Sequence, residues 1–290
     1  DAKAKGRNGC RYYTPALTAV AVHRVELEAG LRRALAHDEL VLMYQPQVEV
    51  RDGSIATVEA LVRWQTPDGR LVPPLEFIPF AEECGLIDAI GSWVLRRACH
   101  DAAQWQRRGL DLRVAVNLSP VQFRASGLLD RIREALADSD LPAERLELEI
   151  TESALMADDA DTHATLAALR TLGIGIALDD FGTGYSSLSC LKRLPLDKLK
   201  IDRSFVSGLP DDVDNHAIVR AILALARHLG FRITAEGVET AAQAELLGEL
   251  EADSLQGYLF SRAVPAAELE ALASRRWPPA RGTQFRIDFS

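Results

Sequence analysis

The sequence predicts an α/β protein of the TIM-like (β/α)8 barrel class. Short runs rich in β-branched residues alternate with longer helical segments along most of the 290 residues, and runs such as VAVNLS and IGIAL suit strands that are buried on both faces. Eight such runs occur, which is the number of strands that this barrel needs. A doubly wound open sheet is the alternative, although no βα turn carries a GxGxxG fingerprint. The expected strands are 41–50, 57–64, 113–119, 146–153, 174–182, 198–205, 232–239 and 253–260.

The residues ahead of the first strand are expected to form a tail, 1–14, and a linker helix, 15–39. The tail is basic and breaks at a glycine-rich turn, residues 6–9. The helix is rich in alanine and leucine, with Leu27, Leu31 and Leu35 spaced four apart on one face. This pattern favours packing on the barrel that follows, and it fits an ordinary surface helix as well as a signalling helix.

The first two strands are expected to be antiparallel. Only residues 51–56 separate them, too few for a crossover helix, so the chain should turn near Asp52-Gly53 in a hairpin. Between Trp64 and Arg113 there is instead an excess of helical sequence, and Gly109 should end its second helix. We therefore expect a barrel domain over 40–276 with an antiparallel first strand, followed by a C-terminal tail, 277–290.

Composition limits the function classes. The chain carries 33 basic and 42 acidic residues, a formal net charge of −9, which is the wrong sign for gripping nucleic-acid phosphates unaided. No stretch approaches a membrane-spanning length of apolar residues, so we expect a cytoplasmic domain without a membrane segment. The four cysteines are scattered, without the spacing of a zinc site or a disulfide framework.

Polar side chains recur near the carboxyl ends of the expected strands. In a barrel those ends meet at a single mouth, where catalytic groups collect. Taken alone, each such residue is more often a helix cap or a surface charge, but their joint placement is poorly explained in that way. The set comprises Glu59, Asn117, Glu149 with Glu152, Asp179 with Asp180, Lys200 with Asp202, Glu236 with Glu239, and Gln256.

So many carboxylates at one mouth need a counter-charge, because like charges raise each other's pKa. The ligands are oxygen donors, carboxylates and an amide, which favours Mg²⁺ or Mn²⁺ over zinc or copper. The adjacent pair Asp179-Asp180 could place one carboxylate between two ions, as in two-metal phosphoryl-transfer sites. A barrel glycosidase using Glu236 with Glu149 or Glu152 is the rival, but it has no need for the aspartate pair, a strand-end lysine or an asparagine.

The motifs that carry these residues resemble a known family. VEALVRW, NLS, EITES, DDFGTGYSSL, KIDRSFV, AEGVE and QGYLF, in this order from about Leu40 to Pro265, are similar to the EAL family of cyclic di-GMP phosphodiesterases. The first fourteen or so residues resemble the end of a GGDEF (diguanylate cyclase) domain, so we expect a piece of a longer protein with a GGDEF domain upstream. After QGY the chain departs from the family, with Ser261-Arg262 in place of a basic residue and proline.

The resemblance implies hydrolysis of cyclic di-GMP to linear pGpG through in-line attack by water that two metal ions activate. It implies one Mg²⁺ or Mn²⁺ site and a second that shares Asp179, and it assigns Lys200 to the attacking water, Glu152 to anchoring the DDFGTG loop, and Glu236 to metal ligation, general base catalysis or both. The implied catalytic residues are Glu59, Asp179, Lys200 and Glu236; the metal ligands are Glu59, Asn117, Glu149, Asp179, Asp180 and Glu236; the substrate contacts are Gln45, Leu61, Arg63 and Gln256.

Two further expectations concern partners. A catalytically silent receptor, which would bind cyclic di-GMP and signal through the linker helix, is the alternative to the enzyme. Related domains pair near the metal site, so we expect a homodimer through the 182–190 loop and the following segment, where Tyr185, Leu188 and Leu191 offer apolar surface.

Overall fold

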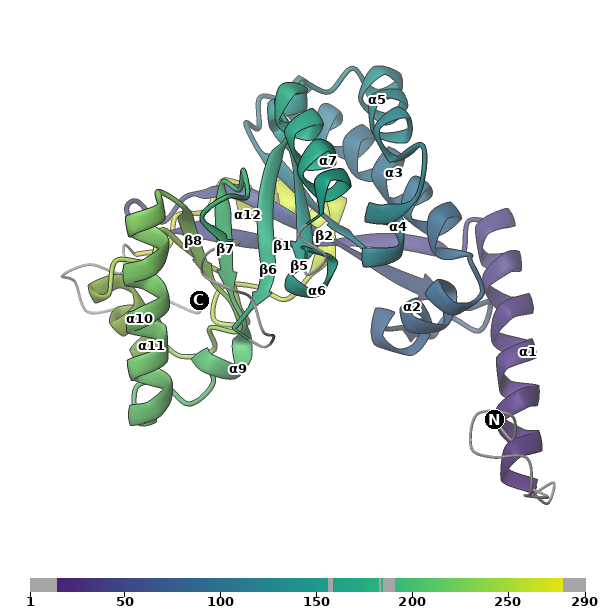
Figure 1. Cartoon of the computed structure of the whole chain (residues 1–290), viewed down its shortest axis with the longest axis horizontal. Coiled ribbons are helices and arrows are strands. Elements are labelled where there is room, and N and C mark those ends of the chain that lie inside the picture. Colours follow the sequence, from purple (N-terminus) through teal and green to yellow (C-terminus); the bar gives the residue numbers. More distant parts are fainter. Residues whose placement is uncertain (1–14, 156–158, 183, 185–190, 279–290) are drawn as a thin grey trace.

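The computed structural model describes residues 15–155, 159–182, 184 and 191–278 of the chain (Figure 1). The expected tail over 1–14 lies outside these residues, as do most of the 182–190 loop and all of the C-terminal tail beyond residue 278. Cys84 and Cys99 are free thiols, whereas Cys10 and Cys190 fall outside the described part of the chain.

The predicted strands close into a barrel. Their order around it is β1-β9-β8-β7-β6-β5-β4-β2, and pairing of β2 with β1 completes the ring. From β2 to β9 each barrel strand pairs in parallel with the next, and β1 alone is antiparallel to both of its barrel neighbours, β2 and β9. The barrel prediction is confirmed, and an open sheet is excluded. The strands are β1 (Leu40–Glu49), β2 (Ile55–Gln65), β4 (Arg113–Leu118), β5 (Leu146–Thr151), β6 (Gly175–Phe181), β7 (Lys198–Ile201), β8 (Arg232–Ala235) and β9 (Ser254–Leu255), with short β3 (Leu71–Val72) and β10 (Val264–Pro265) at the margins.

The hairpin between β1 and β2 turns where the sequence predicts. Gly53 has φ +67°, and the Asp52 carboxylate accepts the backbone N–H of Ser54 at 3.0 Å. Trp277 docks on this turn, because its N–H donates to the carbonyl of Gly53 at 3.0 Å and its ring packs edge-on against Phe260. The packing of the barrel therefore extends to Trp277, one residue beyond the expected boundary at 276.

Helices surround the barrel on its outer side, with α3, α5 and α7 along one flank and α10 and α11 along another (Figure 1). The two helices expected between Trp64 and Arg113 are present, and Gly109, with φ +84°, follows the end of the second. None of the described helices is both long and apolar enough to cross a membrane. Their bounds are α2 (Pro74–Glu83), α3 (Ile87–Arg107), α4 (Pro120–Arg124), α5 (Leu128–Ser139), η1 (Ala143–Arg145), α6 (Glu152–Leu155), α7 (Ala160–Thr171), α9 (Arg203–Val206), α10 (Val213–Leu229), α11 (Ala241–Glu249) and α12 (Ala266–Ala273).

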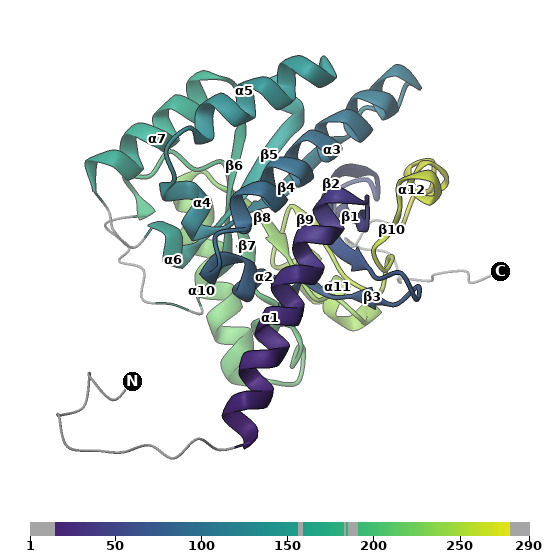
Figure 2. The ribbon, with the colours of Figure 1, turned by 90° about the vertical axis from the view of Figure 1, so that its right-hand side faces the viewer.

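The linker helix α1 (Pro15–Ala36) meets the barrel only through its C-terminal end and projects away from it at the other end (Figure 2). Leu31 is fully buried, and Gly30 lies so close to the ring of Trp64 that an added Cβ would stand 2.6 Å from it. The indole N–H of Trp64 donates to the Glu39 carboxylate at 3.1 Å. Packing of the helix on β2 thus uses the leucine face that the sequence indicates.

The hydrophobic core lies between the barrel and its helices, where Tyr44 packs on Trp105 with ring centroids 4.7 Å apart. The interior of the barrel is polar instead. Because side chains alternate along a strand, residues two apart on β1, β5 and β7 point into the barrel together. They form two layers, one at the mouth and one beneath it.

Candidate functional site at the barrel mouth

The carboxyl ends of the parallel strands bring most of the predicted polar residues together. Parallel pairing in register places these ends side by side, as at Asn117 and Glu149. The residues come from seven neighbouring strands and the turns that follow them: Glu59 on β2, Asn117 on β4, Glu149 on β5, Asp179 and Asp180 on β6, Lys200 on β7, and Glu236 and Gln256 after β8 and β9.

Lys200 stands at the centre of the mouth. Its side chain is only 1% exposed, and its Nζ lies 2.7 Å from Glu149, 3.1 Å from Asp179, 2.5 Å from Glu236 and 3.7 Å from Glu59. Burial works against its charge, but the surrounding carboxylates, with Asp179 the strongest, outweigh burial and raise the pKa of Lys200 well above its usual value. Lys200 is therefore a permanent cation inside an acidic cage.

Glu59 is the most strongly held of the acids. Its carboxylate accepts hydrogen bonds from Asn117 Nδ2 and from Gln256 Nε2, both at 2.6 Å. Burial acts to raise the pKa of Glu59, but the charge of Lys200 and these two amides outweigh burial and leave the pKa lowered. Glu59 thus stays ionised and fixed in orientation.

Glu149 and Glu236 do not share this advantage. Burial, followed by repulsion from Glu59, raises the pKa of Glu149 well above its usual range. Burial, only partly offset by Lys200, raises the pKa of Glu236 to about 8. One ammonium cannot balance four carboxylates, so without a further cation the mouth holds protons at neutral pH.

A local distortion adds a fifth acid. The pairing of β6 with β7 shifts register between Leu178 and Phe181, and Asp180 in this bulge has φ +54°. The bulge breaks the alternation of the strand, so two consecutive carboxylates reach the same mouth. Burial, followed by repulsion from Asp179 and Asp202, raises the pKa of Asp180.

The donor set fits hard divalent cations. Within the described residues, no three acidic, histidine or cysteine side chains surround a common point as in a formed metal site; the carboxylates close on Lys200 instead. Yet Gln256 Oε1 is buried and accepts no hydrogen bond from any described group, and Asp179 Oδ1 meets only Lys200 Nζ, at 3.1 Å. Excess negative charge, unused oxygen lone pairs and the absence of sulfur or imidazole from the cage match the preferences of Mg²⁺ and Mn²⁺.

The expected substrate contacts line the rim on β1 and β2. Gln45 donates to the Ser261 carbonyl at 3.1 Å and accepts from Gln256 at 3.3 Å. Leu61 and Arg63 are half-buried on the same face of β2 as Glu59. Burial lowers the pKa of Arg63, whose guanidinium feels the charge of Glu59 and donates to the carbonyl of Val62 at 2.9 Å.

The departure after QGY adds a feature that the motifs did not indicate. Arg262 stacks over the ring of Tyr258 at 4.3 Å from its centroid. Tyr258 is 56% exposed, which is unusual for a large aromatic side chain. The two residues form a flat, cationic surface at the edge of the barrel.

Glu152 lies behind the mouth. It is buried, and its Oε2 accepts the backbone N–H of Gly182 at 3.3 Å, while an added Cβ at Gly184 would stand 2.7 Å from its Oε1. The start of the 182–190 loop therefore rests on Glu152. Residues 183 and 185–190, with Tyr185 and Leu188, lie outside the described residues, and Leu191 is 1% exposed, so the prediction that it offers apolar surface is wrong.

Two strand-end acids do not join the cage. Asp202 caps α9 by accepting the N–H of Ser204 at 3.0 Å, and Glu239 is exposed beside the cap of α11. Conversely, sequence reasoning missed the layer beneath the mouth, Gln47, Glu147 and Lys198. Its signal was present, since each lies two residues from a predicted mouth residue or rim contact on the same strand.

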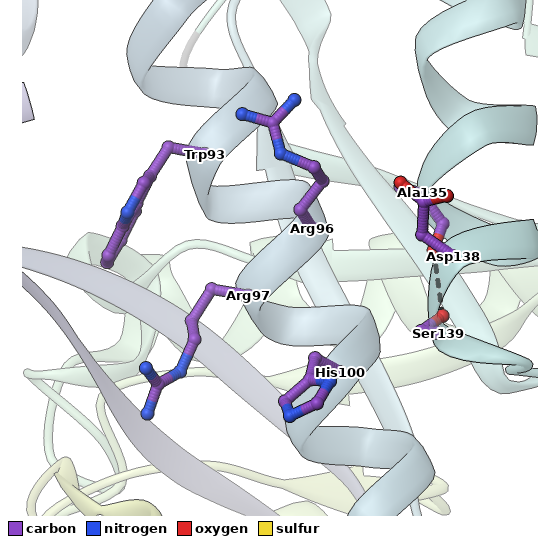
Figure 3. Close-up of a pocket in the computed structure, with 7 residues that line it drawn as sticks. All are labelled: Trp93, Arg96, Arg97, His100, Ala135, Asp138 and Ser139. Atoms are coloured by element: carbon purple, nitrogen blue, oxygen red, sulfur yellow. Dashed lines mark hydrogen bonds between the residues drawn. The ribbon is translucent and has the colours of Figure 1, made fainter.

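A second hollow lies outside the barrel, between α3 and α5 (Figure 3). It measures about 310 Å³ and is lined by Trp93, Arg96 and His100 of α3 and by Asp138 of α5. None of its lining residues belongs to the mouth. The candidate site is therefore the mouth, where charge and burial are concentrated.

The fold and the site define a TIM-like barrel with an acidic, lysine-centred mouth at the carboxyl ends of its parallel strands. The sequence model of the EAL domain matches residues 28–263, and the chain belongs to the EAL domain family. MucR of Pseudomonas aeruginosa, described as a bifunctional diguanylate cyclase/cyclic di-GMP phosphodiesterase, is 48% identical over 271 residues, which cover 93% of this chain and 40% of MucR.

Further similar proteins carry descriptions that also refer to cyclic di-GMP. The cyclic di-GMP phosphodiesterase NbdA of Pseudomonas aeruginosa is 45% identical, over 93% of this chain and 35% of its own length. The solved structure of the PaMucR phosphodiesterase in complex with c-di-GMP superposes with a TM-score of 0.81 at 49% identity, covering 84% of this chain and 99% of that one. The FimX EAL domain from Pseudomonas aeruginosa bound to c-di-GMP gives 0.76 at 29% identity, over 82% and 96%. This chain spans less than half the length of MucR and NbdA.

Proposed function

We propose that this chain is a metal-dependent phosphodiesterase that hydrolyses cyclic di-GMP to linear 5′-pGpG. The observation that carries the proposal is the cage of four carboxylates around Lys200, with Asp180 beside it. An acidic mouth repels a phosphodiester unless divalent cations reverse its charge. The names of MucR and NbdA, and the ligand in the PaMucR complex, support this choice of substrate.

Two sets of oxygen ligands suit two ions of Mg²⁺ or Mn²⁺. Bound there, the ions would supply positive charge to the phosphate and lower the pKa of water. Glu59, held by Asn117 and Gln256, provides a ligand that is ionised in advance. The first set is Glu59, Asn117, Glu149 and Asp179, and the second is Asp179, Asp180 and Glu236.

The residues of the chain then divide the work of hydrolysis. Water attacks phosphorus and gives up a proton to a carboxylate of the cage, the bond from phosphorus to the 3′ oxygen breaks, and the 3′ oxygen takes a proton from solvent to leave as a hydroxyl. Lys200 orients the attacking water by donating a hydrogen bond, a role suited to a buried ammonium that stays charged. Glu236, whose Oε1 lies 2.5 Å from Lys200 Nζ, would take the proton of the water in the loaded site, where the ions hold its carboxylate ionised.

Binding of the substrate would use the rim. The guanidinium of Arg63 can donate two parallel hydrogen bonds to a phosphate, and its partial burial strengthens such a contact. Gln45 and Leu61 lie on the same side of the barrel and would contact the nucleotide. Glu152 would anchor the start of the DDFGTG loop through its bond to Gly182.

The test is to incubate the metal-free protein with cyclic di-GMP and either Mg²⁺ or Mn²⁺ and to separate the products. We expect linear pGpG with either ion and none in EDTA. Stoichiometric recovery of unprocessed dinucleotide would favour the receptor, and turnover that is insensitive to EDTA would refute the metal-dependent mechanism.

Assembly and context form a second part of the proposal. We infer a cytoplasmic homodimer through the 182–190 segment, with a GGDEF domain upstream in the full-length protein. The bond between Glu152 and Gly182 would couple an interface at this segment to Asp179 and Asp180, which lie just before Gly182 in the chain. Sedimentation that finds a fully active monomer at all concentrations would refute the dimer.

A further inference from the structure

A buried ion pair lies directly beneath the mouth and takes no part in the chemistry above. The Nζ of Lys198 on β7 donates to Glu147 Oε1 on β5 at 2.6 Å, and both side chains are almost fully buried. The same Nζ donates to Gln47 Oε1 on β1 at 3.0 Å. Gln47, which is 1% exposed, then donates from Nε2 to Glu149 Oε1 at 3.4 Å. These contacts form a polar column from the ion pair to the cage.

The column has a fixed polarity. An ammonium group can only donate hydrogen bonds, so the Gln47 amide must turn its oxygen toward Lys198. Its NH₂ group must then face Glu149, whose Oε2 is already held by Lys200 at 2.7 Å. The two oxygens of Glu149 are thus held from different strands, β1 below and β7 beside it.

We propose that Gln47 is a positioning residue for the cation site, which sets the orientation of the Glu149 carboxylate, and that Lys198 and Glu147 fix the direction of its amide. The inference rests on the cation site of the proposed function, and only its consequence for hydrolysis rests also on the proposed substrate. Partners behind metal ligands commonly contribute 10- to 100-fold to affinity, roughly, because they fix the ligand in advance.

Another buried polar side chain inside the barrel offers a matched control. Thr234 on β8 is fully buried, points into the barrel from the position paired with Lys200, and shares a hydrogen bond of 2.7 Å with Ser254. Among the described residues, neither Thr234 nor Ser254 shares a hydrogen bond with a residue of the cage. A merely structural role of buried polar groups would affect both positions alike.

The experiment measures Mn²⁺ binding to the metal-free protein by electron paramagnetic resonance, without substrate. For Gln47→Met, which keeps the length but removes the amide, we expect affinity to fall about 10-fold, and for Thr234→Val less than twofold. Gln47→Glu, the closest in shape, should lose more than Gln47→Met because its carboxylate cannot donate to Glu149 and adds repulsion. A role in filling space predicts the opposite order.

Kinetics separate this inference from the proposed function. If the chain hydrolyses cyclic di-GMP, Gln47→Met should raise the Mn²⁺ concentration for half-maximal activity by the same factor and recover most of its kcat at saturating Mn²⁺. If the chain is catalytically silent, the binding measurement alone still tests Gln47. Wild-type Mn²⁺ affinity in both Gln47 variants, or an equal loss in Thr234→Val, would overturn the inference.

Discussion

Both layers inside the barrel place a glutamate from β5 beside a lysine from β7, but they differ in net charge. In the lower layer, Lys198 pairs with Glu147 at 2.6 Å, and Arg113 adds a contact of 3.8 Å to the same carboxylate. In the upper layer, two residues further along β5 and β7, one lysine faces four carboxylates. The net charge of the lower layer is therefore zero or positive, whereas that of the upper layer is strongly negative.

This difference separates structural from functional burial of charge. In a hydrogen-bonded ion pair each charge is neutralised by its partner, so the pair needs no cation from solution. An unbalanced cage is retained only where something else completes it, and here hard oxygen donors select divalent cations. Mutations in the two layers should therefore fail in different ways.

The largest effect should come from the upper layer. Asp179→Asn or Glu59→Ala removes a ligand charge from the cage, so hydrolysis of cyclic di-GMP should fall on the order of 10³-fold. Steady-state rates measure the loss, and circular dichroism verifies that the barrel remains folded. Substantial activity in a folded variant would show that the site lies elsewhere.

The lower layer should respond in stability. Lys198→Met leaves Glu147 buried with only the more distant Arg113, and removal of one partner of a buried pair costs about 3–5 kcal/mol. Urea unfolding in EDTA measures it. Lys198→Met combined with Glu147→Leu should recover most of the loss, because no unpaired charge remains. A double variant as unstable as the single one would contradict this view of the pair.

Cation binding should stabilise the whole chain through the upper layer. At a free Mn²⁺ concentration of 100 times Kd, one site contributes about 2.7 kcal/mol to the free energy of unfolding. Thermal unfolding with Mn²⁺ and with EDTA measures the difference. Asp179→Asn should remove most of it, while the double variant of the lower layer should keep about half, ~1.4 kcal/mol, because releasing Gln47 weakens Mn²⁺ binding about 10-fold; the reverse pattern would break the comparison.

A further effect concerns pH in the metal-free protein. The pKa of Glu236 is raised from 4.5 to about 8, so the folded chain holds a proton that the unfolded chain releases. This contribution to stability is complete below pH 4.5 and is lost as the pH rises through about 8. Urea unfolding in EDTA at several pH values should show the decline, and Glu236→Gln should make it shallower, while the raised pKa values of Glu149 and Asp180 leave the remainder. An unchanged slope in that variant would exclude Glu236 as its source.

The sequence predicted the barrel and the cage because both depend on local signals. Strand runs end in carboxylates, and parallel strands place such ends together. Glu59 and Glu149 could therefore be assigned to the same site from the sequence alone. Asp202 and Glu239 carried the same signal and were misplaced. β7 and β8 end at Ile201 and Ala235, earlier than the runs suggested, so that Asp202 and Glu239 lie beyond the strands and turn away from the cage.

The lower layer escaped prediction for a different reason. A polar residue at every second position also describes a strand with one face in water. Only closure of the barrel shows that the polar face of β5 and β7 points inward, where Glu147 and Lys198 must pair. The role of Gln47 depends in turn on the direction of its amide, which no sequence pattern encodes.

The central claim is that the upper layer is a site for divalent cations, and counting bound ions tests it most directly. Titration of the metal-free protein with Mn²⁺, followed by electron paramagnetic resonance, should show two ions per chain. Asp179→Asn should lose both, and the variant with Lys198→Met and Glu147→Leu should bind the same number as the wild type. No bound Mn²⁺ in the wild type, or unchanged binding in Asp179→Asn, would contradict the account.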